Sequence, residues 1–144
     1  MVYRAMTIFL TIVTSQGLTW PPALLIALGA IGGALARFYI NEYCVRQFGT
    51  KFPWGTFFIN LSGAFLMGGV SGLVWQKILV SADLELFFTI GCLGSYTTFS
   101  TYALETSGLL RQGHYSQAAV YGGGSVILGG ICLELGRSCV QWWQ

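Results

Sequence analysis

The stretch "GCLGSYTTFSTY", from Gly91 to Tyr102, decides the fold because it interrupts an otherwise apolar segment. Hydroxyl side chains occupy five of seven successive positions within it: Ser95, Thr97, Thr98, Ser100 and Thr101. These side chains compete with a helix for its backbone groups, and the preceding glycines lower the cost of leaving helical geometry. The stretch therefore predicts a broken helix whose freed carbonyl groups are able to bind a cation.

The composition of the whole chain is typical of a membrane protein. Of the 144 residues, 54% are hydrophobic and 8% are charged, whereas a soluble domain carries roughly 25% charged residues. Apolar runs cover residues 21–40, 55–75, 84–110 and 116–135, and about 20 apolar residues are enough to cross a bilayer. We expect an all-α membrane protein with four transmembrane helices, of which the third is broken near the bilayer midplane.

The charge distribution leaves the orientation of the chain open. Residues 1–20 are expected to form an N-terminal extension of unknown role, and residues 21–144 a single four-helix transmembrane domain. Lysines and arginines are divided almost equally between the two sides of an alternating four-helix layout. Because Lys/Arg asymmetry normally fixes orientation, such a chain is able to insert both ways up. The alternative is one orientation set by other features.

Small residues predict tight contacts between the helices. Gly-x-x-x-Gly pairs occur at Gly29 and Gly33 and again at Gly68 and Gly72. This spacing lets helix backbones approach closely in lipid. Four helices alone enclose little interior, so the 20 glycines of the chain predict a homo-oligomer.

Several classes of protein are disfavoured by the sequence. The net charge of +2, without a basic run, gives no reason to expect a nucleic-acid partner. The cysteines form no Cys-x-x-Cys pair and are interpreted as packing residues; they are Cys44, Cys92, Cys132 and Cys139. No nucleophile–base or metal-ligand constellation is found, so we do not expect an enzyme.

Polar residues inside the apolar runs are the candidates for a functional site, because such groups are costly at membrane depth. Asn60 lies one turn after Thr56 on a shared face, and it either lines a pathway or joins two helices by a hydrogen bond; the residue alone favours the second. Arg37 either snorkels to the interface, which is the commoner fate, or marks a positive vestibule. Tyr121 and Ser125 form either a polar track or an interfacial tyrosine beside a self-bonded serine.

The apolar runs and their ends also contain aromatic and charged residues. Phe99 and Tyr102 are three residues apart and share a helix face, where ring edges offer an anion a weakly positive contact or simply pack. A surface ion pair between Glu134 and Arg137 is expected. The remaining ionisable residues near helix ends and in loops, Glu105 and His114, are assigned no role.

Three segments resemble motifs of the Fluc (CrcB) family of small fluoride channels, and they occur in the same order and at similar spacing. They are "GAIGGALARF" at 29–38, "GTFFINLSGAFLMGG" at 55–69 and "GCLGSYTTFSTY" at 91–102. The resemblance covers nearly the whole chain after Pro22. It implies a fluoride-selective channel that passively exports fluoride across the cell membrane and lowers its cytoplasmic concentration. It also implies an antiparallel dual-topology dimer, either of identical chains or with a related subunit.

The resemblance also implies roles for individual residues. A structural Na⁺ would be held at the dimer centre by the backbone carbonyls of Gly94 and Thr97. The fluoride pathway would be lined by Asn60, Phe99, Tyr102, Thr98, Ser100, Tyr121, Ser125 and Arg37. The chain departs from the family pattern where Tyr102 replaces a phenylalanine, where Ser95 replaces a glycine, and where Gly129 replaces a polar residue.

Two other functions remain open from the sequence. A small proton-coupled multidrug exporter of similar size would use a carboxylate within its first helix, and this chain has none there before Glu42. A non-transporting membrane scaffold would use the polar residues only to hold helices together.

Overall fold

The computed structural model describes residues 18–79 and 81–142, so most of the predicted extension at 1–20 lies outside the described residues. Within these residues, three helices are long and apolar enough to cross a membrane: α2 (Pro22–Phe48), α3 (Trp54–Trp75) and α7 (Tyr115–Trp142). The remaining crossing is built from four consecutive pieces: α4 (Ala82–Leu86), the π-helix η1 (Phe87–Leu93), α5 (Gly94–Tyr96) and α6 (Phe99–Arg111). The expected all-helical fold with a broken third crossing is confirmed.

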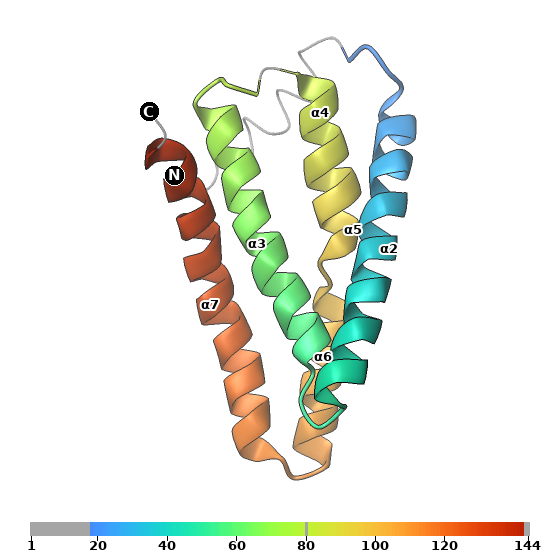
Figure 1. The fold of residues 1–144 in the computed structure, drawn as a ribbon, viewed down its shortest axis with the longest axis vertical. Coiled ribbons are helices and arrows are strands. Elements are labelled where there is room, and N and C mark those ends of the chain that lie inside the picture. The colour runs from blue at the N-terminus through green and yellow to red at the C-terminus, as the bar shows by residue number, and fades with distance from the viewer. Residues whose placement is uncertain (1–17, 80, 143–144) are drawn as a thin grey trace.

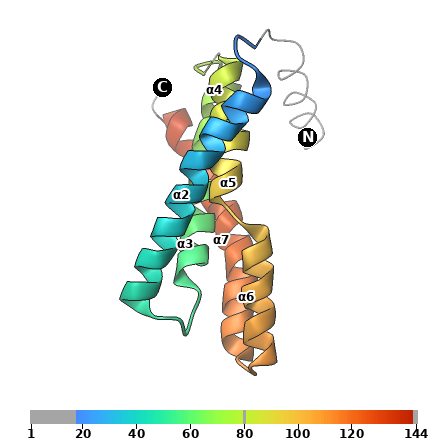
Figure 2. The same cartoon turned by 90° about the vertical axis from the view of Figure 1, so that its right-hand side faces the viewer.

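The helices form an elongated bundle in which the third crossing changes neighbours at its break (Figure 1). Its first half, from α4 to α5, packs along α2, and its second half, α6, packs along α7. Figure 2 shows the change of direction between α5 and α6. The break thus lies where the third crossing leaves α2 and joins α7, and the pieces on either side of it, α5 and α6, both contact α3.

Two helices are longer than the apolar runs predict. α2 continues from residue 40 to Phe48 and includes Glu42 and Arg46, which lie beyond the apolar run. These two side chains form an ion pair of 3.3 Å one turn apart, which supports the polar end of a helix. The helix ends before Gly49, which has a φ of 75°. α7 likewise extends beyond residue 135 to Trp142.

Glycine contacts confirm the predicted close approach of the helices. A Cβ atom on Gly33 would overlap the Cys92 carbonyl and the Ser95 hydroxyl on the third crossing. A Cβ atom on Gly68 of α3 would overlap the Leu133 carbonyl of α7. Both Gly-x-x-x-Gly segments therefore bring one helix backbone directly against another.

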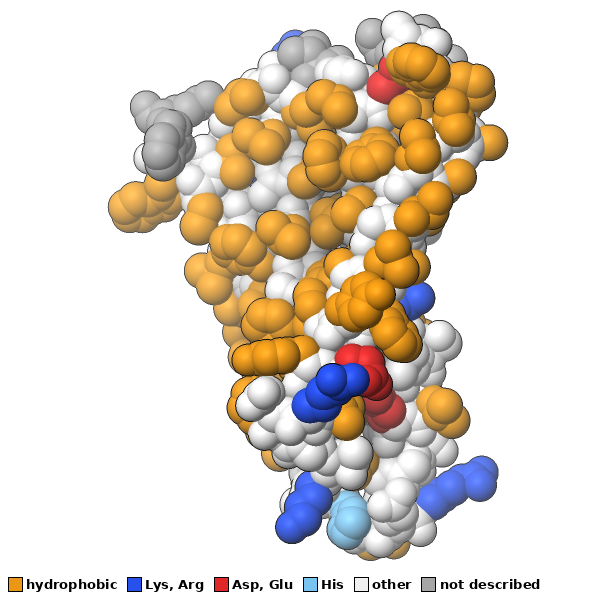
Figure 3. All heavy atoms as spheres, turned by 45° about the vertical axis from the view of Figure 1, so that its right-hand side comes forward, with side chains coloured by type: hydrophobic (Ala, Val, Ile, Leu, Met, Phe, Trp, Pro, Cys, Tyr) orange, Lys and Arg blue, Asp and Glu red, His pale blue; other side chains and the backbone are white. Residues whose placement is uncertain are grey.

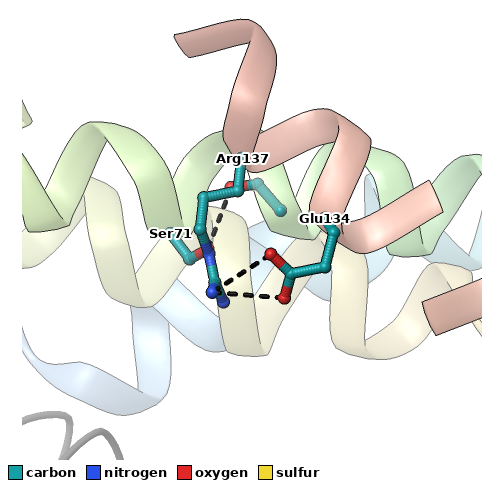
Figure 4. A network of polar contacts seen from close by, with 4 residues as sticks. Ser71, Glu134 and Arg137 are labelled. Carbon is teal, nitrogen blue, oxygen red and sulfur yellow. Dashed lines mark hydrogen bonds and ion pairs between the residues drawn. The ribbon is translucent and has the colours of Figure 1, made fainter. Parts of the chain in front are cut away.

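The face of the molecule drawn in Figure 3 is largely apolar over its upper part, and the charged side chains lie mainly toward its lower end. Large side chains such as Leu35, Phe38 and Leu104 are more than half exposed. An apolar exterior over helices of this length suits contact with lipid. The expected surface pair is also present, since Arg137 Nη1 lies 3.2 Å from Glu134 Oε1 on α7. Figure 4 shows this pair together with Ser71 of α3.

Candidate functional site

The site is centred on two extended residues that separate α5 from α6. Thr97 and Thr98 have ψ values of 158° and 118°, far from helical geometry. The Thr98 hydroxyl accepts a hydrogen bond from the Thr101 N–H at 3.2 Å and so caps the start of α6. The run of hydroxyl residues therefore both stops one helix and starts the next.

Asn60 of α3 completes the backbone hydrogen bonding that the break would leave open. Its Nδ2 donates to the Thr98 carbonyl at 3.0 Å, and its Oδ1 accepts from the Thr98 N–H at 2.9 Å. A buried backbone group without a partner is costly at membrane depth. The interhelical hydrogen bond favoured for Asn60 is thus present, and it lies directly at the break.

The same contacts release two carbonyl oxygens from their helical partners. In a continuous helix, the Gly94 carbonyl would accept from Thr98 N–H and the Thr97 carbonyl from Thr101 N–H. Here these N–H groups donate to Asn60 and to the Thr98 hydroxyl. The freed oxygens belong to Gly94 and Thr97, the two residues for which the family resemblance implies a Na⁺. Among the described residues, no cluster of three or more His, Cys, Asp or Glu side chains could hold a metal.

Arg37 reaches the break from α2 instead of following the snorkelling path favoured by its position in the sequence. Its Nη1 donates to the Thr97 carbonyl at 3.4 Å. A carbonyl oxygen has two lone pairs, so this contact leaves Thr97 a second acceptor direction. The guanidinium places a positive charge beside the break.

A cavity of about 330 Å³ lies next to the break. Its polar lining is contributed by Asn60, Thr97, Thr98, Tyr102 and Ser125. The Ser125 hydroxyl is buried and has no hydrogen-bond partner within the described residues. Ser125 therefore lines the cavity and its buried hydroxyl is not self-bonded, unlike the serine considered from the sequence.

The predicted aromatic pair lies beside the same cavity. The rings of Phe99 and Tyr102 have centroids 5.5 Å apart, and Phe99 is 78% exposed in the single chain. The Tyr102 hydroxyl donates to the Gly122 carbonyl of α7 at 2.8 Å. Tyr102 is thereby fixed with its ring toward the cavity. Ser100 is exposed, and its hydroxyl lies 3.3 Å from that of Thr98.

A second polar cluster joins three segments on the α6–α7 side of the bundle. Glu105 of α6 accepts a hydrogen bond from the Thr56 hydroxyl at 3.0 Å and another from the Tyr121 hydroxyl at 2.6 Å. Tyr121 is completely buried, which excludes the interfacial position considered for it. Thr56 and Asn60, predicted to share a face, both bind residues of the second half of the third crossing.

Sequence reasoning missed Glu105. Its acidic side chain stands six residues before the end of α6, inside a segment expected to cross the membrane. A carboxylate at such a depth is itself a signal of function. The sequence shows this carboxylate at membrane depth, but it does not show that Thr56 and Tyr121 bind it.

A largely apolar helical exterior, a broken crossing and an adjacent polar cavity are typical of small membrane transport proteins. Residues 24–137 match the family model described as "CrcB-like protein, Camphor Resistance (CrcB)". The chain belongs to this family, and the resemblance inferred from three segments is confirmed.

Similar proteins carry the name "Fluoride-specific ion channel FluC". The one from Synechococcus sp. (strain JA-2-3B'a(2-13)) is 42% identical over 119 residues, which cover 83% of this chain and 92% of the relative. The one from Synechocystis sp. is 50% identical over 113 residues, covering 78% and 87%. A third, from Trichormus variabilis, is 44% identical over 112 residues, covering 77% and 82%.

Proposed function

We propose that this chain is a fluoride-selective ion channel that passively exports fluoride across the cell membrane and so lowers fluoride in the cytoplasm. The observation that carries the proposal is the cavity beside the break, where the buried Ser125 hydroxyl has no hydrogen-bond partner in the part of the chain that the structure describes. The names of its relatives support fluoride as the ion.

The chemistry of the cavity suits a small anion. Fluoride holds its hydration water strongly, so a pathway must replace that water with hydrogen-bond donors. Ser125 offers an O–H group, and the Asn60 amide has a second N–H besides the one bonded to Thr98. Neutral donors hold the ion without the strong trapping of a buried cation, and conduction requires release as well as binding.

The aromatic residues offer the ion ring edges in addition to hydroxyl groups. The edge of an aromatic ring is weakly positive. Because the Tyr102 hydroxyl is bonded to Gly122, this residue presents its ring to the cavity much as phenylalanine would. The departure at Tyr102 is therefore compatible with a two-ring pathway formed with Phe99.

The working unit is proposed to be an antiparallel dual-topology homodimer. Gly94, Phe99 and Ser100 are exposed at the break of the single chain, and irregular backbone at membrane depth is tolerated only against protein or water. A second copy would cover this surface. The even distribution of Lys and Arg agrees with insertion in both orientations, and a related subunit is the alternative partner.

A structural Na⁺ is proposed at the centre of this dimer. The freed carbonyls of Gly94 and Thr97 would hold it, since hard cations prefer oxygen ligands. Bound by carbonyl oxygens of both chains, the positively charged ion would hold the two broken helices together. The Arg37 guanidinium, which already donates to the Thr97 carbonyl, orients that oxygen.

The two alternatives have weaker support. A proton-coupled exporter would use a carboxylate within its first helix, whereas Glu105 lies in the third crossing and is engaged by Thr56 and Tyr121. A scaffold needs no unpartnered donor beside a cavity, yet Ser125 is one.

The test is fluoride release from liposomes that contain the purified chain. Vesicles loaded with fluoride should release it to an electrode when the potassium gradient is opened with valinomycin, while vesicles loaded with chloride should retain their ion. Protein-free vesicles provide the control. Retention of fluoride under a favourable gradient in sodium buffer would overturn the proposal.

A further inference from the structure

Ser95 stands where the family pattern has a glycine, and it follows directly after Gly94 in the single turn of α5. Its Oγ lies 2.7 Å from the Gly91 carbonyl and 3.0 Å from the Cys92 carbonyl of η1. It also lies 3.1 Å from the Ala30 carbonyl of α2. The hydroxyl has one hydrogen, which it donates to one of these oxygens at a time or shares between them. Ser95 thereby ties the last turn before the break to η1 and to α2.

The surface of α2 opposite Ser95 has room for this hydroxyl because residue 33 is a glycine. A Cβ atom on Gly33 would overlap the Ser95 hydroxyl as well as the Cys92 carbonyl. Gly33 is buried and Ser95 is half-buried. Figure 1 and Figure 2 both show α5 lying beside α2. Gly33 and Ser95 therefore form a close contact that a larger residue at position 33 would exclude.

The same face of α2 also carries Arg37. Ala30, Gly33 and Arg37 follow one another at intervals of three and four residues, so they share one side of the helix. Arg37 Nη1 donates to the Thr97 carbonyl at 3.4 Å. The other two residues contact Ser95. One face of α2 therefore holds both the turn before the break and the first extended residue of the break itself.

The position of Ser95 determines the direction of the Gly94 carbonyl, one of the two oxygens freed at the break. Because the peptide bond is planar, this oxygen lies in one rigid plane with the N and Cα atoms of Ser95. A serine tied to α2 restricts how that plane can turn. A glycine at position 95 would have neither the tie nor the restricted backbone torsions of a residue with a Cβ atom. Gly94 is exposed and has no side chain of its own, so Ser95 supplies this restraint.

We propose that Ser95 is a positioning residue for the structural Na⁺, because its contacts with α2 fix the Gly94 carbonyl before the cation binds. The inference rests on the Na⁺ site of the proposed function, whose carbonyl oxygens are ligands that suit a hard cation. Oxygens that are already ordered bind a cation more tightly, since little freedom is lost on binding. An ordered set of oxygens also adapts less to a larger ion. Ser95 therefore sets the affinity of the site and its preference for Na⁺ over K⁺.

The test measures thermal unfolding of the purified chain in detergent over a series of Na⁺ concentrations. Choline replaces Na⁺ at constant ionic strength, and the protein concentration is kept constant. A ligand that binds only the folded state raises the unfolding midpoint once its concentration exceeds its Kd, so the onset of the rise gives an apparent Kd. Ser95→Gly should raise the apparent Kd for Na⁺ about three- to tenfold, because it removes both restraints. Ser95→Ala, which lacks only the hydroxyl, should raise it about two- to fivefold.

The preference for Na⁺ is measured in a parallel series with K⁺. In Ser95→Gly, the apparent Kd for K⁺ should rise less than that for Na⁺, because a less ordered site adapts more easily to the larger ion. The ratio of the K⁺ and Na⁺ Kd values should therefore fall about twofold or more. A merely structural role for Ser95 predicts a lower midpoint at every cation concentration, with both Kd values unchanged.

Ser62→Ala is the matched control, since Ser62 makes the same kinds of contact with α5 from the α3 side. Its Oγ donates to the Phe58 and Ile59 carbonyls of its own helix at 2.8 and 3.2 Å. It also lies 2.9 Å from the hydroxyl of Tyr96 in α5. Ser62→Ala should lower the unfolding midpoint but leave the apparent Kd for Na⁺ unchanged, because Ser62 is not part of the peptide plane that carries the freed oxygen.

The outcomes distinguish this inference from the proposed function. If the native chain responds to Na⁺ and both Ser95 variants keep its apparent Kd, the role of Ser95 is overturned while the Na⁺ site stands. The same holds if Ser62→Ala shifts the Kd as much as Ser95→Ala does. A native midpoint that does not change with Na⁺ overturns the Na⁺ site together with the role of Ser95. Fluoride release by the native chain in liposomes is measured separately and decides the channel alone. If Ser95→Gly does not fold, Ser95→Ala decides the role of Ser95.

Discussion

The side-chain amide of Asn60 and the backbone of Thr98 exchange two hydrogen bonds, 3.0 and 2.9 Å long. One α3 side chain thereby takes the place of the helical hydrogen bonds that the third crossing loses at its break. Asn60→Leu should leave both Thr98 groups without partners, at about 1–3 kcal/mol for each. We expect a lower thermal unfolding midpoint in detergent together with loss of fluoride flux. Ser71→Ala on the same helix, whose hydroxyl bonds the Gly68 carbonyl, is the control.

Ser125 separates a role in conduction from a role in stability. Its hydroxyl is buried and has no hydrogen-bond partner among the described residues, so Ser125→Ala removes no protein hydrogen bond and should not lower the free energy of unfolding. If the hydroxyl donates to the ion, losing a hydrogen bond of about 1 kcal/mol lowers flux roughly fivefold. Liposome flux and thermal unfolding are measured on the same preparation. Unchanged flux would remove Ser125 from the pathway.

Gly32 and Gly33 provide a matched pair on α2. A Cβ on Gly33 would overlap Cys92 and Ser95, whereas a Cβ on Gly32 meets nothing within 4 Å. Gly33→Ala should therefore destabilise the protein by about 1–3 kcal/mol or more through overpacking. Gly32→Ala should be neutral or stabilise by up to about 1 kcal/mol through helix propensity. Unfolding midpoints of the two variants check this, and equal midpoints would contradict the packing described here.

Glu105 and Tyr121 should show a measurable coupling energy. Tyr121→Phe removes the 2.6 Å hydrogen bond, and Glu105→Leu removes its acceptor together with that of Thr56. In a double-mutant cycle, the coupling between Tyr121 and Glu105 should be about 0.5–3 kcal/mol. Additive changes in unfolding free energy would mean that the contact contributes nothing net. Glu105→Gln, which keeps one acceptor, should lose less stability than Glu105→Leu.

Removing sodium tests the proposed cation at Gly94 and Thr97. A ligand that binds only the folded state stabilises it by about 2.7 kcal/mol at a concentration of 100 times its Kd. Replacing Na⁺ with choline at constant ionic strength should therefore lower the unfolding midpoint and the fluoride flux together, and returning Na⁺ should restore both. A midpoint and flux that do not respond to sodium would contradict the site.

The break, the role of Asn60 as an interhelical link and the close helix contacts were predictable because each depends on local chemistry. Hydroxyl residues compete with a helix wherever they occur, and glycines at four-residue spacing fit any neighbouring backbone. The π-helix η1 was not predicted, because its wide turn depends on how Gly29 and Gly33 of α2 fit against it.

The features of the site that the sequence did not predict depend on contacts between residues far apart in the chain. Arg37 meets Thr97 across 60 positions, whereas its position at the end of an apolar run favoured the membrane interface. Thr56 meets Glu105 across 49 positions. Such pairs follow from which helices are adjacent, and a single sequence does not state that adjacency.

The π-helix η1 (Phe87–Leu93) makes the third crossing sensitive to its own length. Its i→i+5 bonding accommodates a residue beyond what an α-helix would hold in the same space. Because of this extra residue, winding the whole segment as an ordinary α-helix would rotate everything downstream by about 100°, unless one residue were deleted at the same time. Ser95 would then turn away from the Ala30 carbonyl it now binds, and Thr98 would move out of reach of Asn60. All the pathway side chains would still be encoded, yet they would no longer meet.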